Sequence, residues 1–68
     1  MEKLRGIIVF YLPNKGYGYV RVPDTREEFR FRQANLKQTV VAGDHVCFVL
    51  KQGRTGYFAD QIELLGIV

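Results

Sequence analysis

The chain has 68 residues, with 10 Lys and Arg against 7 Asp and Glu, which gives a formal net charge of +3. A chain this short forms one domain and buries only about 60% of the surface that it exposes when unfolded, so it has little room for a deep catalytic cavity. We therefore expect a single domain over residues 1–68, with its core over about 4–65, and no enzymatic activity. The composition, 47% hydrophobic and 25% charged, is that of a folded globular protein, and the excess of basic residues favours a polyanionic partner.

The cysteine, the histidine and the apolar runs exclude several other classes of protein. Cys47 is the only cysteine and His45 the only histidine, so an internal disulfide is impossible and a zinc site has too few ligands. The longest apolar run, Ile7–Leu12, is far shorter than the roughly 18 residues of a membrane span, and the N-terminus lacks the features of a signal peptide. We expect a cytoplasmic monomer without metal, cofactor, membrane contact or small-molecule substrate.

Apolar residues recur with a period of two along the chain, which predicts β-strands rather than helices. The first strand is expected over Gly6–Tyr11, a segment rich in β-branched and aromatic residues. Proline and glycine within residues 13–16 predict a turn, and a second strand over Tyr17–Val22 follows directly. The two strands are therefore predicted to form an antiparallel hairpin.

A third strand is predicted over Glu28–Arg32, where apolar and basic residues alternate. Neighbouring side chains of a strand point to opposite faces, so Phe29 and Phe31 should enter the core. Arg30 and Arg32 should then face outward together, because two unpaired buried guanidinium groups would cost far more than two exposed rings.

The segment 33–42 has no clear period and is predicted to form a loop with one helical turn. A fourth strand is expected to open at Gly43-Asp44. Its inner face is predicted to carry Val46, Phe48 and Leu50.

The last turn is predicted at Gln52–Gly56, where two glycines can adopt positive φ, and the last strand at Tyr57–Leu65. Five short strands fit a closed barrel better than an open sheet, whose edges would stay unprotected in so small a protein. The predicted fold class is all-β, a five-stranded antiparallel Greek-key barrel of the OB type.

The segment Lys15–Val20, which reads Lys-Gly-Tyr-Gly-Tyr-Val, carries the strongest functional signal. Strand alternation places Tyr17, Tyr19 and Arg21 on one outer face, and the two glycines are expected to leave the ring faces open to a flat ligand. Nucleic-acid bases are flat and stack on such rings for about 1–3 kcal/mol each, and their phosphates attract cations. The phosphate contacts are expected from Lys15, Arg21, Arg30 and Arg32.

The same residues allow one other structural interpretation and exclude one other kind of site. Tyr17 and Tyr19 could be ordinary strand residues that lie against a neighbouring strand. A dinucleotide site is excluded, because the Gly-x-Gly pair precedes a strand and no helix N-terminus follows to hold a pyrophosphate.

Two residues beside the last predicted turn are further candidates. Arg54 and Tyr57 could supply a phosphate contact and a stacking face, with a plain exposed hairpin as the equal alternative. Phe58 could line the core or the rim of the binding face, and alternation does not decide between them.

Three segments together resemble the cold-shock domain with its two ribonucleoprotein motifs: Gly6–Tyr11, Lys15–Val20 and Phe29–Arg32. The segments Gly43–Val46 and Gly53–Gly56 continue the similarity, which extends from about Leu4 to Leu65. The resemblance implies a five-stranded OB barrel that stacks bases on Phe10, Tyr17 and Tyr19. Phe10 rests on the resemblance alone, because the run around it is apolar on both faces.

The chain departs from typical cold-shock proteins in its second motif and its loops. Arg30 and Arg32 stand where the family presents a phenylalanine and a histidine. Val9 and Leu12 replace a basic residue and an asparagine. The expected stacking platform is therefore smaller and more cationic. The short loop before Gly43 is similar to that in the cold-shock domains of RNase II- and RNase R-type exoribonucleases.

The sequence predicts a module that binds single-stranded RNA or DNA, as an RNA chaperone or an accessory RNA-binding domain. An RRM has a similar first motif but needs two helices and about twenty more residues. The alternative from another class is a small β-barrel that binds a protein or the ribosome through its tyrosine face. The predicted binding residues are Phe10, Tyr11, Lys15, Tyr17, Tyr19, Arg21, Arg30, Arg32, Arg54 and Tyr57, and no catalytic or metal-binding residue is expected.

Overall fold

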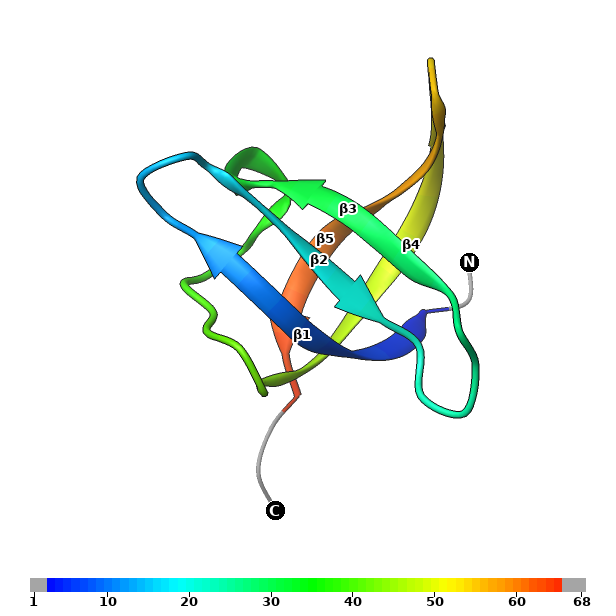
Figure 1. Cartoon of the computed structure of the whole chain (residues 1–68), viewed down its shortest axis with the longest axis horizontal. Coiled ribbons are helices and arrows are strands. Elements are labelled where there is room, and N and C mark those ends of the chain that lie inside the picture. Colours follow the sequence, from blue (N-terminus) through cyan, green and yellow to red (C-terminus); the bar gives the residue numbers. More distant parts are fainter. Residues whose placement is uncertain (1–2, 66–68) are drawn as a thin grey trace.

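The computed structural model describes residues 3–65 as a closed all-β barrel (Figure 1). Its elements are β1 (Leu4–Leu12), β2 (Tyr17–Arg21), β3 (Glu28–Arg32), the 3₁₀ turn η1 (Gln33–Asn35), β4 (His45–Gly53) and β5 (Gly56–Leu64). The strands are ordered β1-β2-β3-β5-β4, and β4 closes the ring by pairing with β1. The predicted strands are confirmed to within two residues at each end, and the single helical turn expected after β3 is η1.

The prediction of a purely antiparallel sheet is wrong, because β3 and β5 run parallel. Strand direction can alternate all the way round a closed ring only if the number of strands is even. A five-stranded ring therefore contains at least one parallel pair, and here it is the seam between β3 and β5. Both directions of pairing are compatible with an OB-type barrel.

The seam between β3 and β5 is short. Within the described residues the two strands are joined at Arg30 and Phe58, and a separate parallel bridge joins Leu36 to Ile62. The β4–β5 hairpin continues past this point, and its yellow and orange tip extends beyond the rest of the barrel in Figure 1. Strands β3 and β5 therefore separate from each other at this end of the molecule.

The core is built from the inward-facing side chains of all five strands and of the segment before β4. Its fully buried members are Ile8, Val20, Phe31, Val40, Val46, Phe48, Ala59 and Ile62. Phe31 is inward as predicted, and Phe29 is half-buried with its ring centroid 6.3 Å from that of Phe48. Arg30 and Arg32 are exposed on the opposite face.

The predicted inner face of β4 is correct at Val46 and Phe48, and less complete at Leu50, which is only partly buried against the core. The register between β4 and β5 shifts between Cys47 and Val49. Gln61, which lies in the opposing part of β5, has a φ of 50°. A bulge of this kind bends the strand and breaks simple alternation.

Candidate functional site

Three aromatic rings from β1 and β2 lie side by side on the outside of the barrel. The ring centroid of Phe10 is 5.4 Å from that of Tyr19 and 6.0 Å from that of Tyr17. All three side chains are half-buried, so part of each ring remains open to a ligand. Phe10, Tyr17 and Tyr19 are called the aromatic face below.

Phe10 joins this face because of a bulge in β1. Ile8 pairs with Val20 and points inward, whereas Phe10 pairs with the outward Tyr19, with the register shifted by one residue between them. Val9 is the extra residue and is 40% exposed. Strict alternation from Ile8 would have turned Phe10 into the core, and the bulge reverses it.

Arg30 lies at the centre of this outer surface. Its guanidinium carbon is 5.3 Å from the ring centroid of Tyr17, within the range of a cation–π interaction. In register, Arg30 stands beside Tyr19 on β2 and beside Phe58 on β5. Paired residues of neighbouring strands share a face, so Phe58 faces outward with Arg30.

A groove of about 580 Å³ opens where β3 and β5 separate. Its walls are β3 with η1 on one side and the end of the β4–β5 hairpin on the other. Three arginines and three aromatic residues are among those that line it: Arg30, Arg32, Arg54, Phe31, Tyr57 and Phe58. The Phe31 side chain itself is fully buried in the core. This space is called the hairpin groove below.

A chain of polar contacts connects the walls of the hairpin groove. The backbone N–H of Arg32 donates to Asn35 Oδ1 at 2.8 Å, and Asn35 Nδ2 donates to Asp60 Oδ1 at 2.9 Å. The Lys51 ammonium lies 2.8 Å from Asp60 Oδ2. Asp60 therefore holds η1 and β4 together across β5.

The surroundings of Asp60 favour its charged form. The hydrogen bond from Lys51 is the main cause that holds the pKa of Asp60 below its ordinary value, and the bonds from the backbone of Gln61 and from Asn35 act in the same direction. Partial burial opposes them, because the Asp60 side chain is only 17% exposed. The carboxylate remains ionised over the whole neutral range.

This pairing predicts a loss of stability in acid. A depressed folded-state pKa stabilises the fold above the unfolded-state value, and this contribution disappears as pH falls through the lower folded-state value. We expect the urea concentration at the unfolding midpoint to decrease once the pH drops below about 4, the ordinary range of an aspartate pKa. In Asp60→Asn this decrease should be less steep. Glu63→Gln is the matched comparison, because Lys3 also lowers the pKa of Glu63 but at a more exposed position. A wild-type acid profile in Asp60→Asn would contradict the prediction.

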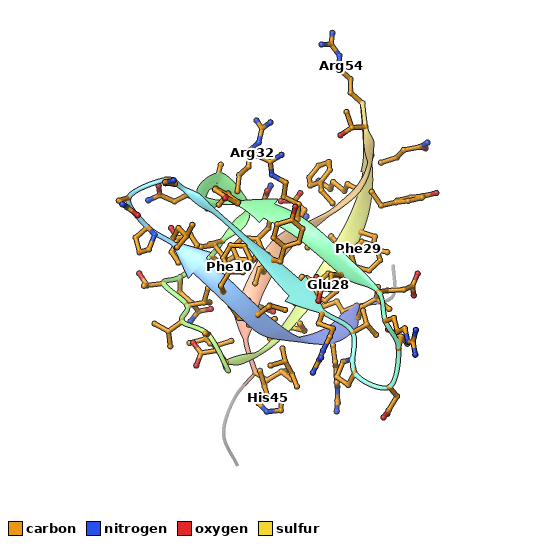
Figure 2. The ribbon with its side chains drawn as sticks, viewed as in Figure 1. Phe10, Glu28, Phe29, Arg32, His45 and Arg54 are labelled. Carbon is orange, nitrogen blue, oxygen red and sulfur yellow. The ribbon has the colours of Figure 1, made fainter. Side chains whose placement is uncertain are left out.

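The remaining predicted binding residues are spread over the surface and the interior. Tyr11 lies on the inner side of β1, with its ring centroid 5.8 Å from that of Phe31, so it does not join the aromatic face. Lys15 is exposed in the β1–β2 turn, and Arg21 is exposed at the end of β2. Arg54 is exposed at the tip of the β4–β5 hairpin, where Figure 2 labels it.

Tyr57 and Phe58 occupy opposite faces of β5. Tyr57 pairs with Gln52 and is 59% exposed, whereas Phe58 pairs with Lys51 and with Arg30. Phe58, which the sequence left undecided, is therefore the aromatic residue of β5 that shares the face of Arg30. The outward position of Phe58 follows from the parallel pairing of β3 with β5, and local alternation of residues does not reveal that pairing.

Gly18 has a different role from the one expected. It is buried and faces inward between Tyr11 and Phe31, so it does not uncover the outer rings. A Cβ on this residue would overlap with the carbonyl oxygen of Phe10 and lie 2.7 Å from the ring of Phe31. Gly18 thus permits the close approach of β1 to β2 that brings Phe10 beside Tyr19.

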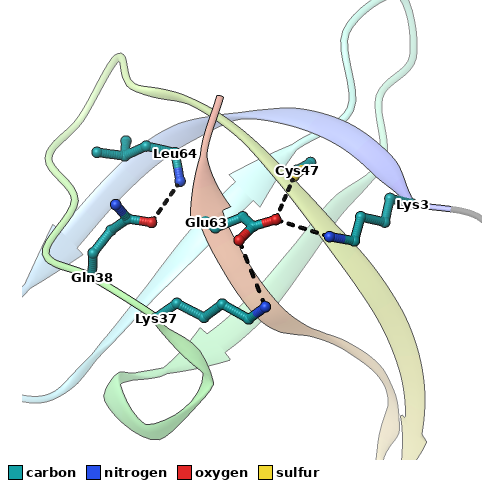
Figure 3. Close-up of polar contacts among 6 residues, drawn as sticks. All are labelled: Lys3, Lys37, Gln38, Cys47, Glu63 and Leu64. Carbon is teal, nitrogen blue, oxygen red and sulfur yellow. Dashed lines mark hydrogen bonds and ion pairs between the residues drawn. The ribbon is translucent and has the colours of Figure 1, made fainter. Parts of the chain in front are cut away.

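A separate polar cluster lies around Glu63 of β5 (Figure 3). Its carboxylate is 2.8 Å from the Lys3 ammonium and 3.6 Å from that of Lys37, and it accepts a hydrogen bond from the Cys47 thiol at 3.6 Å. Nearby, the backbone N–H of Leu64 donates to Gln38 Oε1. The contacts of Lys37 and Gln38 attach the segment after η1 to β5, and the Glu63 carboxylate offsets one of the two lysine charges around it.

No model of a known protein family matches the chain, and neither does any curated protein. Across residues 3–65, no helix is long and apolar enough to cross a bilayer. In the same part of the chain, no three His, Cys, Asp or Glu side chains are grouped so that they could hold a metal ion.

Proposed function

We propose that this chain is an OB-type barrel of the cold-shock kind that binds single-stranded RNA or DNA and has no catalytic activity. The observation that carries the proposal is the aromatic face, in which three rings from two adjacent strands lie together with the Arg30 guanidinium over one of them. Aromatic platforms with neighbouring cations are the usual means of binding unpaired bases without strong sequence preference.

The fold supports the same proposal. The order β1-β2-β3-β5-β4 in a closed five-stranded barrel fits the OB architecture, whose strand 2–3 surface and adjoining loops bind oligonucleotides. The aromatic face and Arg30 lie on β1, β2 and β3. The segments that resemble the cold-shock motifs contribute these side chains. We therefore propose that the chain acts in the cytoplasm as an RNA chaperone or an accessory RNA-binding domain.

Bases can stack on these rings only if they are not already paired and stacked in a helix. We therefore expect the protein to bind an unstructured oligonucleotide in preference to a duplex of the same length. About three to five phosphate contacts should give a log–log salt slope of about −2 to −3.5. Fluorescence anisotropy with labelled single-stranded and duplex oligonucleotides at two salt concentrations measures both quantities.

Two outcomes of this titration would contradict the proposal. Equal affinity for single strand and duplex would show that the rings do not stack on bases. A slope near zero would show that phosphates are not contacted, as expected if the aromatic face binds a protein instead.

A further inference from the structure

We propose that the hairpin groove is a second nucleotide subsite, in which Phe58 stacks on a base while Arg32 and Arg54 contact the flanking phosphates. The inference rests on the proposed function and extends it, because it gives the bound strand a path beyond the aromatic face. The occupant is one nucleotide of the strand that already lies on Phe10 and Tyr19.

The first support is the continuity of the outer surface. Phe10, Tyr19, Arg30 and Phe58 follow one another across β1, β2, β3 and β5 as register partners. Neighbouring strands are about 4.8 Å apart, so Phe58 lies about 14 Å from Phe10 across the sheet. A single strand that leaves the aromatic face over Arg30 therefore reaches Phe58 within a few nucleotides.

The second support is the setting of the Phe58 ring. A Cβ on Gly53 would lie 3.2 Å from Cδ1 and 3.3 Å from Cε1 of Phe58, so the ring rests against the bare backbone of Gly53. Phe58 also lines the hairpin groove and is half-buried. The ring is thus held on one side and borders the groove on the other, as a stacking platform requires.

The third support is the charge of the groove. Arg30, Arg32 and Arg54 line it, and no carboxylate from residues 3–65 does. None of these three arginines forms an ion pair within residues 3–65. The nearby carboxylate of Asp60 is already engaged by Lys51 and Asn35.

The positions of the arginines suit an anionic strand. In Figure 2, Arg32 on β3 and Arg54 at the hairpin tip both extend toward the same end of the barrel. The groove volume of about 580 Å³ falls within the usual range of small-ligand sites, roughly 300–1,000 Å³. An aromatic side and an arginine rim match a base and its phosphates.

The test compares Phe58→Leu with Leu64→Ala on oligothymidylates of two lengths. Both variants shorten an apolar side chain of β5, but Leu64 is an exposed residue at the far end of the strand, outside the groove. A trinucleotide is short enough to lie on the aromatic face alone, whereas a strand of about seven nucleotides, within the site size of an OB barrel, also reaches the groove. Thermal melts show whether both variants fold.

We expect Phe58→Leu to bind the longer strand about 5- to 30-fold more weakly, the lower part of the range for losing one stacked base, and to bind the trinucleotide as the wild type does. Leu64→Ala should stay within about twofold of wild type on both, as expected without a stacking loss. Unchanged binding of the longer strand by Phe58→Leu, equal losses in the two variants, or equal losses on the two lengths would overturn the second subsite. If the wild type binds neither oligonucleotide, the proposed function itself fails.

A charge variant tests the same subsite without touching the packed ring. Arg54→Gln should lower the magnitude of the salt slope on the longer strand by about 0.7, the value of one phosphate contact on a single strand. Arg26→Gln is the matched control, because Arg26 is exposed in the β2–β3 loop outside the groove. Equal slopes in wild type and Arg54→Gln, or an equal change in both variants, would overturn the phosphate contact.

Discussion

Phe31→Ala is expected to lose about 3–5 kcal/mol of folding free energy. The Phe31 side chain is fully buried and contacts Tyr11 and the region around Gly18, so its removal leaves a cavity at the junction of β1, β2 and β3. A chain of this size has a total stability of only about 3–10 kcal/mol. The variant should therefore be largely unfolded at room temperature, which thermal and urea melts followed by circular dichroism will show.

Arg30→Ala is the matched control from the adjacent position on the same strand. Arg30 is exposed and interacts with the ring of Tyr17, and an exposed cation–π contact contributes only about 0.5–1 kcal/mol. This variant should fold and bind single strands more weakly. A stable Phe31→Ala protein beside an unfolded Arg30→Ala protein would contradict the register of β3.

The success of alternation on β3 has a simple physical cause. Over Glu28–Arg32, apolar and charged residues take turns without interruption, and the strand pairs with β2 residue for residue. The opposite register would bury two guanidinium groups, and because that burial is so costly, the sequence alone is enough to exclude this register. The outward position of Arg30, at the centre of the candidate site, was predictable for this reason.

The position of Phe10 was not predictable from its own segment. Every residue from Ile7 to Leu12 is apolar or aromatic, so no charge marks the outer face, and a one-residue bulge decides which side each ring takes. The structure has this bulge between Ile8 and Phe10. Only the resemblance to the cold-shock motif pointed to Phe10, whereas the neighbouring Tyr11 proved to lie against Phe31.

The contribution of β5 was hidden for a different reason. Phe58 and Tyr57 are adjacent aromatic residues, and their faces depend on the partner strands rather than on local pattern. The partner of Phe58 is Arg30, more than twenty residues earlier in the chain, through the parallel seam that closes the barrel. Long-range pairing of this kind decides which surface a residue serves, and it becomes visible only in the folded structure.

Gly18→Ala is expected to be about as damaging as the loss of Phe31, at about 3 kcal/mol or more. The added methyl group would overlap with the carbonyl oxygen of Phe10 and lie 2.7 Å from the Phe31 ring and 3.0 Å from Cα of Tyr11. Two of these three neighbours are backbone atoms of β1, which cannot move aside without breaking the β1–β2 pairing. Urea denaturation of the purified variant measures the loss.

Gly16→Ala separates this steric effect from the general cost of replacing a glycine. Gly16 has a φ of 75°, and among the described residues an added Cβ would meet only the Gln33 side chain, at an ordinary 3.8 Å. The expected cost is therefore conformational only, about 1–2 kcal/mol. Similar losses at both glycines would show that β1 and β2 are not held at the close spacing described here.

A double variant identifies which neighbour of Gly18 is decisive. Phe31→Leu removes the ring atom nearest to the added methyl group but leaves the Phe10 carbonyl in place, so Gly18→Ala combined with Phe31→Leu should not regain the stability of Phe31→Leu alone. Full recovery would mean that the ring, and not the backbone of β1, requires a glycine at this position. If stability is not recovered, β1 must shift away from β2, and this shift separates Phe10 from Tyr19. The fraction of the Gly18→Ala protein that still folds should then bind single strands more weakly than the wild type.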